Sequence, residues 1–599
     1  MTHYPKRLSI SLQEIRCLIL QPLSAGTTVQ CTVEIISLLS HPEYEALSYV
    51  WGDASIQRTI IFNGIPFSVT QNLAIALHHL RLPDKPRRLW VDALCINQGD
   101  VKERNEQVGL MCEIYSMAKP VLIWLGESDD DTDEAFALIS TIASASESDI
   151  TEEMSQTMFS FCIHLVRREW FTRLWTIQEL VLANEDPLVG CGFVWTTWSV
   201  LLKAWQRVAM NEFGKMGMIM KEEVSENENG DNAADSAGVR TSAIRIDLLN
   251  NLRTAVTNKK GEDLRGLLLN TVSSKATEPK DRIYALLGMM PPEDREHLTV
   301  DYQRPLGTIY AEAISYLFRK GQGTFLLSGM ELAGPTPPTK YASFPSWVPK
   351  LGSESLLHPV LFHPPGIGVS GAGSTAINGH ISPDLRTLYI RGLPIDTITK
   401  VCTLGPNQEC LTQLPYLEEL VLQARHLAAL HSHHRPYLHS FKTKEPLWRT
   451  LITNKLYSGA AREVAPESYG EMYSQLLNEQ NIKLERQNEE NDTTREYRLS
   501  LLNHLPNSTF FITTTGFYGI GPSSVEVGDQ LAIWFGAPAP FVLRKIEVQD
   551  QDEGLEEREG GEETFNAVGV AYIAGIMEGE MVDEVYCEDL EDDVVFTVR

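Results

Sequence analysis

The chain has 599 residues, of which 43% are apolar and 22% charged, a composition typical of globular proteins. It carries 51 basic and 79 acidic residues, and the formal net charge of −28 argues against binding to nucleic acid or to an anionic membrane surface. The nine cysteines include no C-x-x-C pair, and no apolar run is long enough to span a bilayer. We therefore expect a cytoplasmic protein of two or three domains.

The first 200 residues predict alternating strands and helices. Apolar runs at 45–50, 88–96, 119–125 and 187–193 are typical of strands. Helices with one apolar face are expected at 70–80, 100–118, 132–144, 152–166 and 173–183, with Thr70 and Asp100 as N-caps. Strands that alternate with helices indicate an α/β domain with a parallel sheet.

The rest of the chain changes in texture. We expect a lead-in at 1–40, the α/β domain at 41–200 and an acidic flexible linker at 215–240. A mainly helical and irregular region should follow at 241–505, and a β-rich acidic region at 506–599. This last region should form a small antiparallel sheet, and from residue 547 it holds 18 acidic but only two basic residues.

Three motifs point to binding sites only weakly. The G-x-G-x-x-G pattern at 366–371 follows two prolines and opens no helix, which favours a loop over a dinucleotide site. Five histidines at 426–439 could bind a metal, but no cysteine or carboxylate set accompanies them, which favours a solvated helix end. The acidic run at 129–134 could ligate a cation or, as we favour, cap the following helix.

Trp175 and Glu179 form the strongest local pattern because residues four apart share one face of a helix. The indole could stack on a flat ring while the carboxylate binds ribose hydroxyls or steadies a developing positive charge. The alternative is that Trp175 packs the helix and Glu179 pairs with an arginine such as Arg173. Spacing alone favours this structural interpretation.

Three blocks occur in the order YEALSYVWGD (44–53), LWVDALCINQ (89–98) and WFTRLWTIQEL (170–180). Together they resemble the fungal heterokaryon-incompatibility (HET) domain over roughly residues 40–190. The segments PKDRIYALLGM and FPSWVPK, and the C-terminal GDQLAIWFGAPAPFVLR, resemble the regions C-terminal to that domain in many such proteins. The resemblance implies a role in nonself recognition in a filamentous fungus, in which the domain triggers programmed cell death.

The HET domain is also remotely similar to TIR domains, which have a flavodoxin-like parallel sheet and in some cases hydrolyse NAD with a glutamate in a W-x-x-x-E context. The resemblance therefore implies that Glu179 is catalytic, that Trp175 holds nicotinamide, and that NAD is a substrate rather than a bound cofactor. No metal is implied.

Ligands of parallel sheets bind beyond the carboxyl ends of the strands. One predicted strand ends at Trp51, Gly52 and Asp53, and the next near Asp92, Asn97 and Gln98; we predict that these residues line the site. Gly52 would let a phosphate approach the backbone, and Arg104 would supply charge. The structural alternatives are that Trp51 and Trp90 belong to the core, that Asp92 is a buried acceptor and that Asn97 only makes a turn.

The sequence supports two hypotheses about function. In the first, the N-terminal domain is an NAD glycohydrolase. In the second, it is a non-enzymatic module that associates with itself or with a protein partner, and cell death results from assembly. The two differ in whether Glu179 is needed for the effect.

Overall fold

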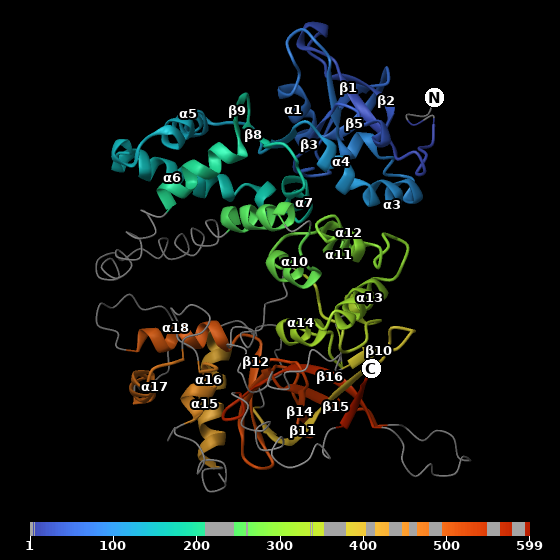
Figure 1. Ribbon diagram of the computed structural model, residues 1–599. Helices are drawn as coiled ribbons and strands as arrows, with labels where there is room; N and C mark the ends of the chain where they lie inside the picture. The colour runs from blue at the N-terminus through green and yellow to red at the C-terminus, as the bar shows by residue number, and fades with distance from the viewer. Residues whose placement is uncertain are drawn as a thin grey trace, which may run out of the picture. The chain divides into compact units, whose positions relative to one another are not determined.

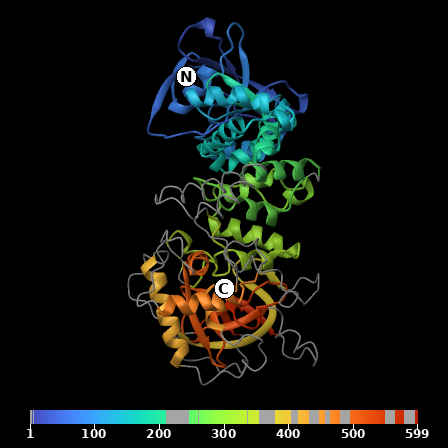
Figure 2. The same ribbon diagram turned by 90° about the vertical axis from the view of Figure 1, so that its left-hand side faces the viewer.

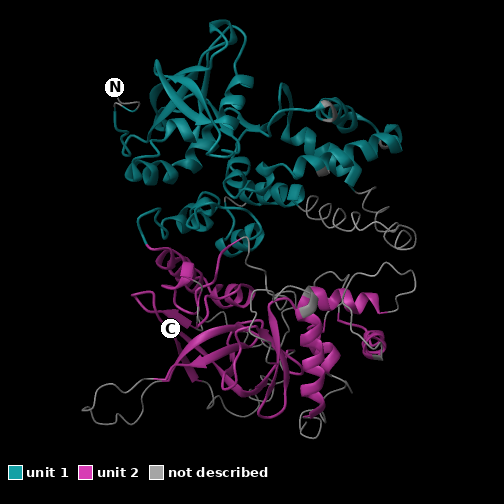
Figure 3. Ribbon diagram, turned by 180° about the vertical axis from the view of Figure 1, so that it is seen from behind, with its two compact units in different colours: residues 1–304 teal, residues 305–599 magenta. Residues whose placement is uncertain are grey.

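A computed structural model describes residues 4, 6–209, 245–258, 261–335, 337, 339–352, 379–402, 414–430, 446–454, 464–478, 494–547, 563–577 and 594–599. The chain divides into two compact units, residues 1–304 and 305–599 (Figure 3). The expected linker at 215–240 and the G-x-G-x-x-G pattern lie outside the described residues. Of the five clustered histidines, only His426 is described.

Unit 1 contains a nine-stranded sheet in the order β5-β4-β2-β1-β6-β3-β7-β8-β9. Its centre is parallel, as expected: β6 (Arg87–Trp90), β3 (Glu45–Ser48), β7 (Val121–Trp124) and β8 (Leu188–Cys191) run in one direction. The whole sheet is mixed, because β1 (Glu14–Leu20) pairs antiparallel with both β6 and β2 (Gln30–Ser37). The hairpins β4–β5 (Gln57–Phe62, Ile65–Thr70) and β8–β9 add further antiparallel pairs, with β9 at Val194–Thr197. The sheet therefore begins within the first 40 residues (Figure 1).

The helices around this sheet begin largely where the sequence places caps. The Thr70 hydroxyl accepts from the amide of Leu73 at the start of α1 (Gln71–His79), and Asp100 caps α3 (Val101–Gly109). The predicted helix at 100–118 is interrupted at Leu110, after which α4 (Met111–Met117) begins. Asp129 caps α5 (Asp130–Ser144), so for this residue of the acidic run the predicted capping role is confirmed. Helix α6 (Glu152–Val166) also forms as expected.

One predicted strand is partly wrong. The run at 88–96 is a strand only to Trp90, and α2 (Asp92–Cys95) is a single helical turn. Leu94 and Cys95 of this turn are buried, so the apolar residues after Trp90 pack into the core as a helical turn rather than as a longer strand. The turn places Asp92 directly beyond the end of β6.

Further helices complete unit 1. These are α7 (Trp175–Val181), α10 (Leu264–Thr271), α11 (Asp281–Leu287) and α12 (Pro292–Arg295), with the short 3-10 helix η4 (Glu169–Thr172) before α7. Helix α11 is buried along its whole length and packs against α7. The described residues between 245 and 304 thus belong to the same compact unit as the N-terminal sheet.

Unit 2 contains a second sheet that closes on itself. Strands β14 (Gln530–Trp534), β15 (Phe541–Lys545), β16 (Thr564–Val570), β18 (Val594–Val598) and β11 (Leu388–Val401) pair in a ring, since β11 also pairs with β14. Only the β16–β18 pair is parallel among the described pairs of this sheet. The long strand β11 curves around the ring (Figure 2) and continues into pairing with β12 (Ser508–Thr513). The remaining strands are β10 (Gly379–Ile381), β13 (Tyr518–Pro522) and β17 (Tyr572–Ile573).

Helices cover one face of this second sheet. Four of them, α15 (Leu414–Leu430), α16 (Pro446–Leu451), α17 (Ser468–Asn478) and α18 (Arg495–His504), share a core with Phe510 and Ile512 of β12. The intervening Phe511 belongs to the core inside the ring, as strand alternation requires. Helices α13 (Leu306–Arg319) and α14 (Gly323–Gly329) begin the unit. The expected order of an N-terminal sheet, helices and a β-rich end is therefore confirmed in outline, but β10 and β11 lie within the region predicted to be helical, so the second sheet does not begin at residue 506.

No helix in the described part of the chain is long and apolar enough to cross a membrane.

Candidate functional site

Glu179 lies on α7 and faces the end of a parallel strand. Its side chain is almost completely enclosed, with the residue 5% exposed. Its Oε2 accepts a hydrogen bond of 2.5 Å from the hydroxyl of Ser48, the last residue of β3. The same hydroxyl accepts from the indole Nε1 of Trp170 at 2.8 Å. A continuous hydrogen-bonded chain thus runs from Trp170 through Ser48 to the Glu179 carboxylate.

The surroundings of Glu179 favour its protonated form. The pKa of Glu179 is raised to about 8, chiefly by burial; the Ser48 hydrogen bond lowers this pKa, whereas the nearby charge of Asp92 contributes to raising it. Removal from water penalises the charged carboxylate more than the neutral acid. A carboxyl group that titrates near neutral pH can give and take a proton under physiological conditions, which is the property required of an acid or base catalyst.

Asp92 is the second carboxylate at the same edge of the sheet. The register pairs Ala46 of β3 with Trp90 of β6, which brings Ser48 level with Asp92. One Asp92 oxygen accepts from the indole Nε1 of Trp51 at 2.7 Å, and the other accepts from the amide of Ala93 at 2.7 Å. Asp92 keeps partial contact with solvent. Burial raises its pKa, while the hydrogen bond from Trp51 lowers it.

The tryptophans and the residues that follow β3 differ in their exposure and in their contacts. Trp51 is 39% exposed and so does not belong to the core, whereas Trp90 is fully buried. Gly52 has a φ of +76°, and a Cβ there would lie 3.1 Å from the Cβ of Asn72. Asp53 is exposed and accepts from the amide of Ser55, which lowers its pKa.

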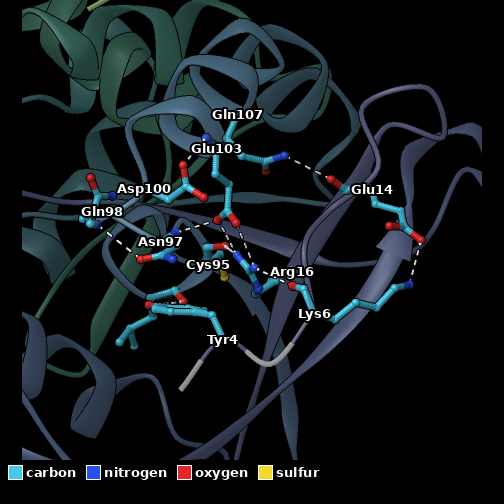
Figure 4. A network of polar contacts seen from close by, with 12 residues as sticks. Tyr4, Lys6, Glu14, Arg16, Cys95, Asn97, Gln98, Asp100, Glu103 and Gln107 are labelled. Carbon is cyan, nitrogen blue, oxygen red and sulfur yellow. Dashed lines mark hydrogen bonds and ion pairs between the residues drawn. The ribbon is translucent and has the colours of Figure 1, made fainter. Parts of the chain in front are cut away.

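The loop after Asp92 is held by a buried ion pair (Figure 4). Arg16 of β1 contacts Glu103 of α3 at 2.5 Å, and Glu103 also accepts from the backbone amide of Asn97 at 2.7 Å. The Asn97 side chain accepts from the amide of Gly99, which is a turn-making role. Gln98 donates from Nε2 to the carbonyl oxygen of Asp92 at 3.1 Å. Asn97 and Gln98 therefore shape the loop that carries Asp92.

Trp175 and Arg104 are engaged by a later part of the chain. The indole Nε1 of Trp175 donates to Asp281 at 2.8 Å, and the other oxygen of Asp281 accepts from the hydroxyl of Tyr302 at 2.5 Å. The guanidinium of Arg104 lies 4.4 Å from the centre of the Tyr302 ring. Trp175 is half-buried rather than open to a ligand.

Two groups thus emerge from the predicted residues. Glu179, Asp92 and Trp51 gather at the ends of β3 and β6, while Trp175 and Arg104 gather around Asp281 and Tyr302. Glu179 hydrogen-bonds Ser48, and Arg173 lies 3.9 Å from Glu169, although the charge of Arg173 also lowers the pKa of Glu179. Sequence reasoning missed Ser48, Asp281 and Tyr302, although Ser48 and Asp281 lie in segments that carry the family resemblance.

Comparison with protein families agrees with this organisation. Residues 44–179 match the family model described as heterokaryon incompatibility protein (HET), and residues 424–591 match the Het-6 beta-barrel domain. The first match runs from β3 to Glu179. The ring of strands extends beyond the second match, since β11 and β18 complete it. The two matched domains support the identification of the chain as a fungal heterokaryon-incompatibility protein.

A curated relative covers almost the whole chain. It is heterokaryon incompatibility protein 6, OR allele, of Neurospora crassa, which is 23% identical over 691 aligned residues. The alignment spans 97% of this chain and 96% of the relative, so both proteins share one domain order. No solved structure matches the chain.

Proposed function

We propose that unit 1 is a TIR-like NAD hydrolase of the cytoplasm that contributes to incompatibility by depleting NAD and killing the cell. In this reaction water adds to the ribose carbon that bears nicotinamide. Nicotinamide leaves with the electrons of the broken bond, and ADP-ribose and a proton are released. The observation that carries the proposal is the meeting of Glu179 and Asp92 at the carboxyl ends of two parallel strands.

The two carboxyl groups suit different parts of this reaction. A glycosidic bond breaks through a positively charged, oxocarbenium-like state that an anion stabilises. Glu179, whose pKa is raised to about 8, holds a proton for much of the time at neutral pH and can hydrogen-bond a ribose hydroxyl. Asp92, whose oxygens accept from the Trp51 indole and the Ala93 amide and which keeps partial solvent contact, supplies the anion that steadies the positive charge and accepts the proton from water.

The test measures nicotinamide release from NAD by the purified full chain. We expect turnover by the wild type and its loss, by a factor of about 100 or more, in Glu179→Gln. The matched control is Glu169→Gln, because Glu169 is 56% exposed by its side chain and lies outside the carboxylate pair. Equal turnover in the wild type and Glu179→Gln would refute catalysis by Glu179.

A non-enzymatic module is the second candidate, and the enclosure of Glu179 favours it. A carboxyl group that is 5% exposed and bonded to Ser48 is also what a purely structural role predicts. On this account unit 1 associates with itself or with a protein partner. Glu179→Gln would then leave toxicity in cells intact, and NAD would stay constant while cells die.

A further inference from the structure

The last residues of unit 1 close over the second group of predicted site residues. Tyr302 lies three positions before Pro305, at which unit 2 begins. Its ring covers the guanidinium of Arg104 and its hydroxyl donates to Asp281, which in turn accepts from Trp175. A single side chain therefore connects α3, α11 and, through Asp281, α7.

Polar contacts and one ring contact hold this segment in place, among them hydrogen bonds between the Tyr284 hydroxyl and the backbone of Asp301. Asn105 of α3 donates from Nδ2 to Asp301 at 3.2 Å and accepts from the amide of Tyr302 at 3.2 Å. Lys280 donates from Nζ to the carbonyl oxygen of Tyr302 at 2.6 Å. Asp301 and Tyr302 are only half-buried, in contrast to the fully buried α11. Segments with few buried apolar contacts open at lower free energy than the core around them.

We propose that Tyr302 is an autoinhibitory latch that withholds Arg104 and Trp175 from a dinucleotide. This inference rests on the proposed function, since it concerns regulation of the same site. An arginine stacked under an aromatic ring presents fewer free donors to a phosphate, and an indole N–H bonded to Asp281 fixes the ring of Trp175 against α11, where Tyr302 bonds the other oxygen of Asp281. Release of Tyr302 uncovers the guanidinium of Arg104 and removes one of the two side chains that hold the Asp281 carboxylate of α11. Trp175 then keeps a single bond, to an Asp281 that is less firmly held.

The position of the latch in the chain suggests how it is released. Leu306, the first residue of α13 in unit 2, comes four positions after Tyr302. A change in unit 2 that pulls on residues 303–305 therefore acts directly on the Tyr302 contacts. The barrel-containing unit would sense a partner, and the latch would transmit that event to Arg104 and Trp175.

The experiment compares full-length wild type, Tyr302→Phe and Tyr302→Ala. Phe keeps the ring over Arg104 and loses only the hydroxyl, whereas Ala removes both contacts. We expect ADP-ribose, used as the probe in calorimetry, to bind Tyr302→Ala about tenfold or more tightly than wild type, with Tyr302→Phe in between. Amide exchange should rise in α3 and at 299–304, and nicotinamide release should rise in the same order.

Tyr44→Phe is the matched control, because its buried hydroxyl donates to the carbonyl oxygen of Ile114 at 2.7 Å and touches no latch residue. It should bind the probe like wild type. If the wild type turns over NAD through Glu179 but Tyr302→Ala neither binds nor reacts better, the latch is refuted and the hydrolase stands. If Tyr302→Ala binds the probe more tightly but no variant releases nicotinamide, the latch stands and the hydrolase is refuted. If no variant binds ADP-ribose, the latch is refuted.

Discussion

The buried ion pair beneath the Asp92 loop makes a quantitative prediction. Arg16 and Glu103 have side chains that are 2% and 3% exposed, and they form two contacts of 2.5 and 3.0 Å. Arg16→Met removes the cation and leaves the Glu103 carboxylate buried with only its hydrogen bond from Asn97. Breaking one side of such a pair costs about 3–5 kcal/mol.

Thermal unfolding followed by tryptophan fluorescence measures this cost in unit 1, because eight of the eleven tryptophans lie in the first 205 residues. At about 2–4 °C per kcal/mol, Arg16→Met should lower the melting temperature of unit 1 by about 6–20 °C. The double variant Arg16→Met/Glu103→Leu should lose less than half as much, because no uncompensated charge remains.

Arg88→Met is the matched control within the same sheet. Arg88 lies 2.6 Å from Glu34, but these side chains are 43% and 36% exposed. Solvent screens such a pair, so its loss should cost about 1 kcal/mol or less. Two outcomes would show that burial is not the reason for the strength of the Arg16–Glu103 pair. In one, Arg16→Met lowers the melting temperature no more than Arg88→Met; in the other, the double variant loses at least as much stability as Arg16→Met alone.

Three further predictions concern the carboxylate edge. Because the pKa of Glu179 rises from 4.5 to about 8 on folding, the folded state binds the extra proton, so the stability of unit 1 should fall as pH rises from about 4.5 to 8. Melting temperatures across this range should show a weaker fall in Glu179→Gln, and an equal fall would contradict the assignment. Ser48→Ala leaves Glu179 and the Trp170 indole without their shared hydrogen-bond partner, so the free energy of unfolding in urea should fall by about 1–3 kcal/mol. A fall below 0.5 kcal/mol, roughly the error of the method, would refute the hydrogen-bonded chain. Gly52→Ala should lower the free energy of unfolding by about 1–2 kcal/mol in the same assay, because the φ of +76° is unfavourable for alanine and the new Cβ would crowd Asn72. An unchanged free energy of unfolding would show that the loop adapts.

Local chemistry made the central strands and the helix starts predictable. Thr70, Asp100 and Asp129 act through neighbours two or three residues away, so the sequence alone contains both partners. The apolar runs of β3, β7 and β8 are short and end at glycine, aspartate or a turn, which limits them to strands. The turn at Asp92 escaped prediction because an apolar run without periodicity fits a strand and a buried helical turn equally well.

The candidate site was predictable only in part, because its contacts join residues far apart in the chain. Glu179 meets Ser48 across 131 positions, and Trp175 meets Asp281 across 106. Spacing on α7 singled out Trp175 and Glu179, but it carried no information about which side chain each would meet. An arginine six residues away was the local candidate, yet the partner is a serine on a neighbouring strand.

The same limit explains the mixed sheet. Strand β1 is buried along most of its length and pairs through its two edges with β2, the next strand in the chain, and with the distant β6, yet nothing in its own sequence identifies β6 as a partner. Pairing between distant strands depends on the assembled core rather than on local propensity.

The most direct test of the central claim measures total NAD in yeast cells that express the full chain, with and without Glu179→Gln, at matched protein levels. We predict that NAD falls severalfold in cells with the wild-type chain and stays normal with Glu179→Gln. Cell death at constant NAD, or an equal fall with both proteins, would contradict hydrolysis by the Glu179 site and would favour the assembly model.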